Sequence, residues 1–237
     1  MTNASEVIDN LGGAAMITGT VILRPLLASR YQRWNTTGDE ATRTLPGDER
    51  VPAPLVTQTL AVTIKASATA VWPWLAQIGQ ERGGMYSYEL LENLARCQMR
   101  NANRIVPEWE LQVGDLVRLG PPGYPVHKVV GLERGRWLLL AGADIKTGEV
   151  PDLPKPGQSD YTNYSWVFSL DERADGTTRL ITRTHLDYAP HSFALKLTWE
   201  WFTDPIGFVM TRKMLLEIKH LAEMTPVPTT VAAVEQP

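Results

Sequence analysis

Residues 85–93, which read M-Y-S-Y-E-L-L-E-N, contain the side chains best suited to acid–base chemistry. Helical spacing places Tyr88 and Glu92 on one face. A glutamate beside tyrosine hydroxyls in an apolar cavity has a raised pKa and acts as a general acid or base. We therefore predict Glu92, Tyr86 and Tyr88 as the catalytic residues of an enzyme, with both tyrosines on a cavity wall. A second interpretation stays open, in which Glu92 faces solvent or braces the turn at residues 83–84.

A second set of polar side chains alternates along the segment 178–187. Arg183, His185 and Asp187 fall on one face of a strand, and Thr182 and Thr184 fall on the other. If the charged face points inward, His185 and Asp187 form an acid–base site. The outer face of such an antiparallel sheet is usually solvated, which favours the opposite orientation. In that case Thr182 and Thr184 face the cavity.

A third candidate is the loop R-I-V-P-E-W at residues 104–109. Arg104 and Glu108 are predicted to form a buried pair that holds the loop to the preceding helix. Such a pair contributes specificity of fold more than stability. Trp109 is predicted to close one end of the ligand pocket.

Composition excludes several classes of function. The net charge of −3 in 237 residues provides no basic footprint for nucleic acid, so no nucleic-acid partner is predicted. Cys97 is the only cysteine, so neither an intrachain disulfide nor a cysteine cluster for metal can form. The four histidines lie on separate predicted elements, without His-Glu-x-x-His spacing, and no glycine-rich phosphate loop occurs. We predict no metal and no cofactor.

Apolar periodicity predicts an α+β domain. Alternation at residues 58–65 is typical of a half-buried strand, and Ser67 is a suitable N-cap for a short helix that follows. A second helix is predicted at residues 88–99, and a long amphipathic helix begins at Pro205. Between them lie hairpin-linked strands, which favour an antiparallel sheet with helices on one side. The predicted strands are 115–119, 125–132, 137–141, 164–170 and 178–187.

The stretch 70–94 joins an aromatic helix, a glycine-bounded turn and an amphipathic helix, and residues 105–109 follow it closely. These segments resemble the helix-grip superfamily of START-like (SRPBCC) proteins, including its polyketide cyclase/dehydrase-like and uncharacterised bacterial members. The resemblance runs from about residue 57 to residue 223. It implies a curved antiparallel sheet wrapped around a long C-terminal helix, with an internal cavity between them.

The resemblance implies a cavity that holds a small, largely apolar molecule. We expect a carrier or sensor, with a polyketide cyclase-like or dehydratase-like enzyme as the alternative, because the superfamily includes both binders and enzymes. A membrane-associated lipid-binding protein is a second alternative. The predicted ligand-binding residues are Trp72, Leu75, Tyr86, Tyr88, Trp109, Trp166, Phe168, Thr182, Thr184, Met210 and Met214.

The chain divides by composition into three parts. Residues 1–55 form an N-terminal apolar segment and linker, residues 56–225 the helix-grip domain, and residues 226–237 a flexible tail. The apolar run at residues 11–23 covers about 20 Å as a helix, less than the roughly 30 Å hydrocarbon core of a membrane. A helix docked on its own domain, an interfacial membrane anchor and a disordered leader all stay open. We expect a cytoplasmic protein, with peripheral membrane association through this segment as the alternative.

Overall fold

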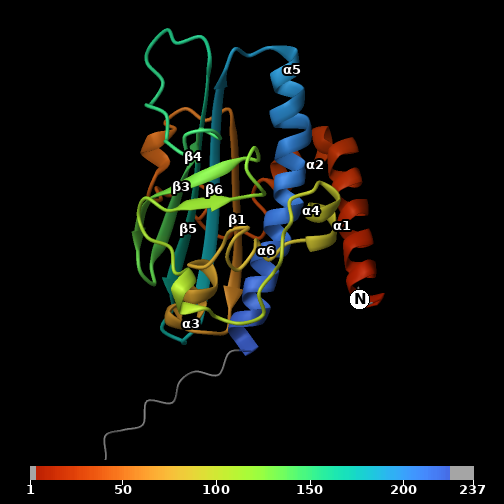
Figure 1. Cartoon of the computed structure of the whole chain (residues 1–237), viewed down its shortest axis with the longest axis vertical. Helices are drawn as coiled ribbons and strands as arrows, with labels where there is room; N and C mark the ends of the chain where they lie inside the picture. The colour runs from red at the N-terminus through yellow and green to blue at the C-terminus, as the bar shows by residue number, and fades with distance from the viewer. Residues whose placement is uncertain (1–3, 225–237) are drawn as a thin grey trace, which may run out of the picture.

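The computed structural model describes residues 4–224 and contains one six-stranded antiparallel sheet with the order β1-β6-β5-β4-β3-β2. Helix α6 packs across one face of the sheet, which we call the inner face (Figure 1). The predicted α+β class is confirmed, and so is the predicted arrangement of an antiparallel sheet packed on a long C-terminal helix. The predicted tail at residues 226–237 lies outside the described residues. The strands are β1 (Val56–Ile64), β2 (Leu116–Arg118), β3 (Val126–Glu133), β4 (Trp137–Ala143), β5 (Tyr161–Glu172) and β6 (Thr178–Ala189).

The C-terminal helix is longer than predicted. Helical backbone begins at Phe193 and runs without a break to Met224, through a π-helical segment. Pro205 therefore does not start the helix, because the π-helical residues 197–203 precede it. The wider turns of a π-helix leave room for the proline ring, so the helix continues through this position. The helices are α1 (Ala4–Ile22), α2 (Arg24–Tyr31), α3 (Ala68–Leu75), α4 (Glu89–Leu94), α5 (Phe193–Lys196), the π-helical η3 (Leu197–Thr203) and α6 (Asp204–Met224), with short 3-10 turns η1 (Asp48–Arg50) and η2 (Pro107–Trp109).

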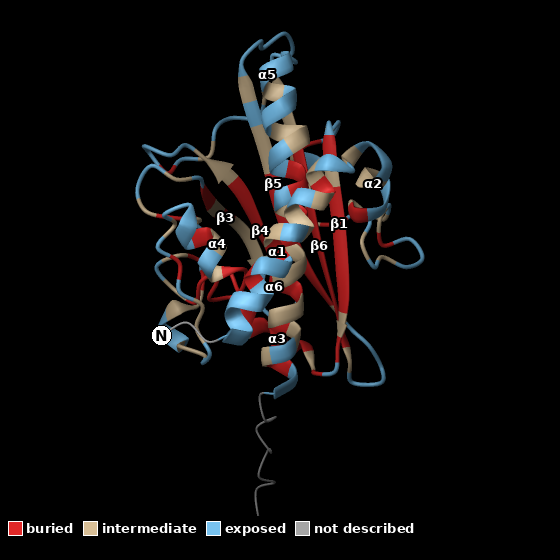
Figure 2. Cartoon of the chain, turned by 90° about the vertical axis from the view of Figure 1, so that its right-hand side faces the viewer, coloured by how far each residue is buried: buried red, intermediate tan, exposed pale blue. Residues whose placement is uncertain are grey.

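The main apolar core lies between the inner face of the sheet and α6. Alternate residues of β1 and β5 point into it, as their period-2 pattern predicts. From the helix side, Leu215, Ile218 and Ala222 recur at helical spacing and are fully buried. Figure 2 shows the strands buried behind α6.

The outer face of the sheet is covered by residues 36–54, which belong to the predicted N-terminal segment and linker at residues 1–55. Leu45 from this segment is 4% exposed and packs in a small apolar cluster on the outer face. The other buried members of that cluster, one from each of four strands, are Ala61, Leu139, Val167 and Ile181.

Two buried arginines of β6 attach this segment to the sheet. Arg179 donates from Nε and Nη2 to the Glu40 carboxylate, both at 2.8 Å. Arg183 donates to Asp48 Oδ2 at 2.6 Å and to the Glu40 carbonyl at 2.8 Å. His185 lies on the same face with Nδ1 3.8 Å from Asp48 Oδ1, and its pKa is lowered by burial. The prediction of a solvated outer face is wrong here, because the segment supplies carboxylate and carbonyl acceptors that replace water.

Helix α4 is shorter than the predicted helix over residues 88–99. It ends at Leu94, and two residues shortly after it adopt left-handed backbone, Arg96 with φ 61° and Gln98 with φ 52°. The side chain of Asn93 accepts a hydrogen bond from the Met99 amide and donates to the Met99 carbonyl. These bonds close a loop where the apolar pattern alone predicted more helix.

Candidate functional site

An aromatic and polar cluster lies on the inner face, across β3, β5 and β6. His127 on β3 is 5.1 Å from the Tyr164 ring and 5.9 Å from the Trp166 ring, both on β5. The intervening strand β4 places Gly142 opposite His127. A Cβ atom at Gly142 would approach Cβ of Tyr164 to 3.3 Å, so a residue without a side chain lets the two rings approach each other.

Two threonines of β6 complete this arrangement, which we call the inner-face cluster (His127, Tyr164, Trp166, Thr182, Thr184). Trp166 Nε1 donates to Thr182 Oγ1 at 2.8 Å, and Thr182 Oγ1 donates to the Val167 carbonyl at 2.9 Å. The Tyr164 hydroxyl is hydrogen-bonded to Thr184. The cluster therefore brings together three of the predicted ligand-binding residues: Trp166, Thr182 and Thr184.

The histidine of this cluster has a buried nitrogen without a partner. Nδ1 of His127 has no hydrogen-bond partner among the described residues, and the side chain is almost fully buried. Burial lowers the pKa of His127 to about 4 and raises that of Tyr164 well above its ordinary value. Both side chains are therefore neutral at pH 7. An unsatisfied buried polar atom costs about 1–3 kcal/mol, which a hydrogen-bonding guest would recover.

Glu92 is a second buried group without a full set of partners. It is 9% exposed, and its Oε2 has no hydrogen-bond partner in the described part of the chain. Burial, together with the nearby charge of Glu89, raises the pKa of Glu92 to about 7. The solvent-facing interpretation of Glu92 is wrong. The turn at residues 83–84 is instead held by Gln77, whose carbonyl accepts from the Gly83 amide at 2.7 Å.

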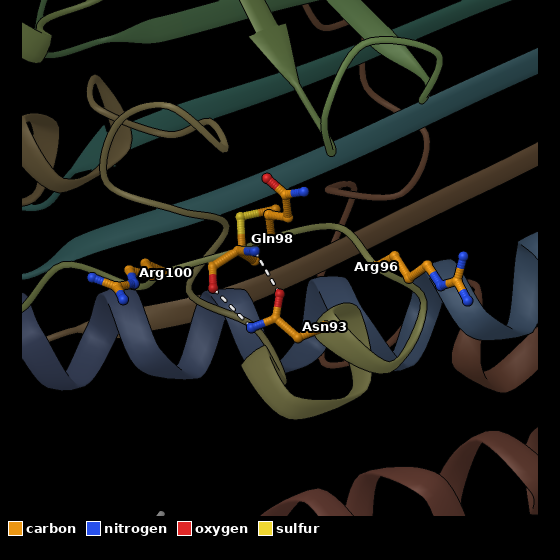
Figure 3. Close-up of a pocket in the computed structure, with 5 residues that line it drawn as sticks. Asn93, Arg96, Gln98 and Arg100 are labelled. Carbon is orange, nitrogen blue, oxygen red and sulfur yellow. Dashed lines mark hydrogen bonds between the residues drawn. The ribbon is translucent and has the colours of Figure 1, made fainter. Parts of the chain in front are cut away.

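Two surface hollows lie near this part of the chain. One of about 450 Å³ is lined by residues at the end of α4 and in the loop that follows it (Figure 3), and Glu92 immediately precedes its first lining residue. Another of about 200 Å³ lies between α1, α6 and residues 86–103. Neither of these two hollows is lined by a residue of the sheet. The lining of the larger one is Asn93, Arg96, Gln98, Met99 and Arg100.

Neither predicted catalytic tyrosine, Tyr86 or Tyr88, forms a hydrogen bond between its hydroxyl and the Glu92 carboxylate. Tyr86 is fully buried, and its hydroxyl accepts from Gln77 Nε2 at 2.6 Å. The Tyr88 ring packs against Gly13 of α1 and lies 5.9 Å from Lys213 Nζ of α6. Both hydroxyls have pKa values raised by burial.

The remaining predicted site residues fall into two groups. Trp72, Leu75, Phe168 and Met214 are packed side chains of the main core, and Met210 is partly buried against it. Trp109 is half-buried in η2. Arg104 and Glu108 are both exposed, so the predicted buried pair is wrong, because the loop turns both side chains outward.

Sequence reasoning missed His127 and Tyr164 as members of a site. It assessed His127 only as a metal ligand, and residues 164–170 only as an apolar strand face. The alternation of inward and outward side chains along each strand could have identified both residues. His127 lies two residues from the buried Val129, and Tyr164 two residues from Trp166, so each shares the inner face of its strand.

No protein-family model matches this chain, and no curated protein matches it. Similar solved structures exist. The truncated norcoclaurine synthase of Thalictrum flavum is 15% identical with a TM-score of 0.39, over 72% of this chain and 96% of that one. A Mycobacterium smegmatis protein is 18% identical with a TM-score of 0.41, over 72% and 93%. The Aha1 dimer of Colwellia psychrerythraea is 17% identical with a TM-score of 0.35, over 70% and 98%.

Proposed function

We propose that this protein binds a small, largely apolar and uncharged molecule at the inner-face cluster, as a carrier or sensor. The observation that carries the proposal is the buried Nδ1 of His127, which lacks a hydrogen-bond partner among the described residues. A buried polar atom of this kind is normally satisfied by protein, by water or by a ligand. Its aromatic surroundings favour a guest with an apolar body and one polar group.

The electrostatics of the cluster select the class of guest. A histidine with a pKa of about 4 carries no charge at pH 7, and no charged side chain belongs to the cluster. A carboxylate or ammonium group would therefore enter without a counter-charge, at a large desolvation cost. A hydroxyl, a carbonyl or an uncharged arylamine N–H group fits, because neutral imidazole offers one donor and one acceptor.

The test uses freshly purified protein and an uncharged apolar dye, N-phenyl-1-naphthylamine. Native mass spectrometry reports any molecule retained from the cell, and dye emission reports occupancy of an apolar site. His127→Phe keeps an aromatic ring and removes both nitrogens. His220→Phe is the matched control, because His220 is exposed on α6. Loss of one hydrogen bond weakens dye binding by about two- to tenfold.

Two results contradict this proposal. One is a wild-type protein that neither retains a molecule nor enhances dye emission. The other is equal dye affinity in His127→Phe and His220→Phe, which would locate the dye elsewhere. His127→Phe is expected to stay folded, because it removes an unsatisfied nitrogen from an apolar environment.

A second candidate function is acid–base catalysis on an apolar, polyketide-like substrate. The observation in its favour is Glu92, a buried carboxyl group with a pKa of about 7, which exists in both protonation states near neutral pH. In this function Glu92 moves a proton, and the apolar surroundings hold the substrate in position. The test is Glu92→Gln assayed against candidate substrates. Loss of turnover with intact dye binding supports an enzyme, and unchanged turnover contradicts it.

A further inference from the structure

One end of the molecule has an unusual group of exposed apolar side chains. Six of them come from two chain segments that are far apart in sequence, the α1–α2 corner and the start of the C-terminal helix. We call this group the corner patch. Its members and their exposures are Ile22 (68%), Leu23 (44%), Leu26 (75%), Phe193 (81%), Leu197 (38%) and Phe202 (47%).

Specific contacts hold the two segments together. The Arg24 guanidinium lies 5.6 Å from the centre of a Trp201 ring and 3.6 Å from Glu200 Oε2. The Tyr31 hydroxyl donates to the buried Asp204 carboxylate at 2.6 Å, and the Tyr31 ring stacks on Phe208. Figures 1 and 2 both show α2 beside the upper part of the C-terminal helix. The corner patch is therefore built from two segments docked side by side.

The charges around the corner patch have one sign. Residues 10–38 contain three arginines and no aspartate or glutamate, and residues 188–199 contain Lys196 and no acidic residue. Arg30, Arg33 and Lys196 are exposed. Glu200 and Asp204, the acids at the contact between the two segments, are already engaged by Arg24 and Tyr31. The exposed charged side chains of these two ranges are therefore all cations. Exposed apolar side chains beside cations suit a lipid membrane, which has an apolar interior and an anionic surface.

We propose that the corner patch docks peripherally on an anionic lipid membrane. Among the described residues no single helix has the length and hydropathy to cross a membrane, although α1 and α2 together pass that test and bend by 112° where they meet. The α1–α2 part of the corner patch is at this bend, and the start of the C-terminal helix is docked beside it. In this proposal the exposed apolar side chains of both segments enter the headgroup region while the helices stay on the domain. A second copy of the chain is a poorer occupant, because two such corners would bring like charges together.

The test is co-sedimentation of the full chain with vesicles of phosphatidylcholine alone or mixed with phosphatidylglycerol. Leu26→Asp combined with Phe193→Asp places charge on the apolar part of the corner patch. Its matched control is Ile145→Asp with Leu153→Asp, since these side chains are 45% and 49% exposed on a loop elsewhere. Circular dichroism checks that each variant folds.

A second pair of variants tests the charges. Arg30→Glu with Arg33→Glu reverses two exposed cations near the corner patch, and Arg134→Glu reverses an exposed cation on the β3–β4 turn. We expect wild-type binding only to the anionic vesicles, reduced at least about tenfold by either corner variant and unchanged by either control.

Three results overturn this proposal. One is the absence of wild-type binding to the anionic vesicles. Another is binding that the corner variants do not reduce, which would assign it to a different surface. The third is a wild-type dimer in solution that Leu26→Asp with Phe193→Asp dissociates, without vesicle binding, which would assign the corner patch to a second copy.

Discussion

Removal of the Glu92 charge should stabilise the protein, but only at higher pH. Burial and Glu89 raise the pKa of Glu92 to about 7 from the ordinary 4.5. A carboxyl whose pKa is higher in the folded state binds its proton more tightly when the chain is folded. Its contribution to stability is therefore complete below about pH 4.5 and is lost as the pH rises through about 7. At 1.36 kcal/mol per pKa unit, the loss is up to about 3 kcal/mol.

The assay compares the free energy of unfolding of wild type and Glu92→Gln by urea denaturation. At about pH 4 both side chains are neutral, and the two proteins should differ by less than about 1 kcal/mol. At about pH 8 the wild type carries a buried, partly unsatisfied carboxylate. The variant should then be more stable by up to about 3 kcal/mol. Contributions from all other titrating groups cancel in the difference.

The control is Glu108→Gln, which removes an exposed glutamate from η2. Its stability relative to wild type should stay within about 0.5 kcal/mol at each pH. A stability difference between wild type and Glu92→Gln that is the same at both pH values would refute the reasoning. It would mean that Glu92 is solvated in the folded protein.

Two further predictions concern how the helical and strand layers are joined. Gly12→Ala should raise the free energy of unfolding by up to about 1 kcal/mol, because nothing lies within 4 Å of its Cβ position and alanine favours helix. Gly13→Ala should lower it, because that Cβ would lie 2.8 Å from the Tyr88 ring; an equal effect of both variants in thermal melts would contradict this packing. Arg183→Met should cost about 1–3 kcal/mol and expose residues 36–54 to limited proteolysis, because the partly exposed Asp48 carboxylate and the buried Glu40 carbonyl both lose the donor that Arg183 supplies.

Strand positions were predictable where one face is buried and the pattern is strictly local. The alternation at residues 58–65 predicted β1, and the alternation at residues 164–170 predicted the central part of β5. Helix ends were less predictable, because they depend on groups that compete with the helix. Asn93 bonds to the Met99 backbone and helps to end α4 early, although the apolar residues that follow continue a helical spacing.

The candidate site was predictable only in part. Trp166, Thr182 and Thr184 were expected to face inward from their strand parity, and they lie on the inner face. His127 joins them only because β4 pairs with both β3 and β5, and that pairing is a property of the whole sheet. Glutamates on helices are usually exposed, which favoured a solvent-facing Glu92, whereas Glu92 is buried. A general frequency of this kind does not describe the particular environment of one residue.

The order of amino acids by itself determined the fold class, the faces of the strands and the amphipathic C-terminal helix, because these follow from the short-range repeats of backbone geometry. Only the tertiary structure decided that residues 36–54 cover the outer face, that α1 and α2 dock at one corner, and that Glu92 and His127 are buried. The physical reason is that burial and pKa depend on which distant atoms replace water around a group. That replacement is decided by packing between segments far apart in the chain.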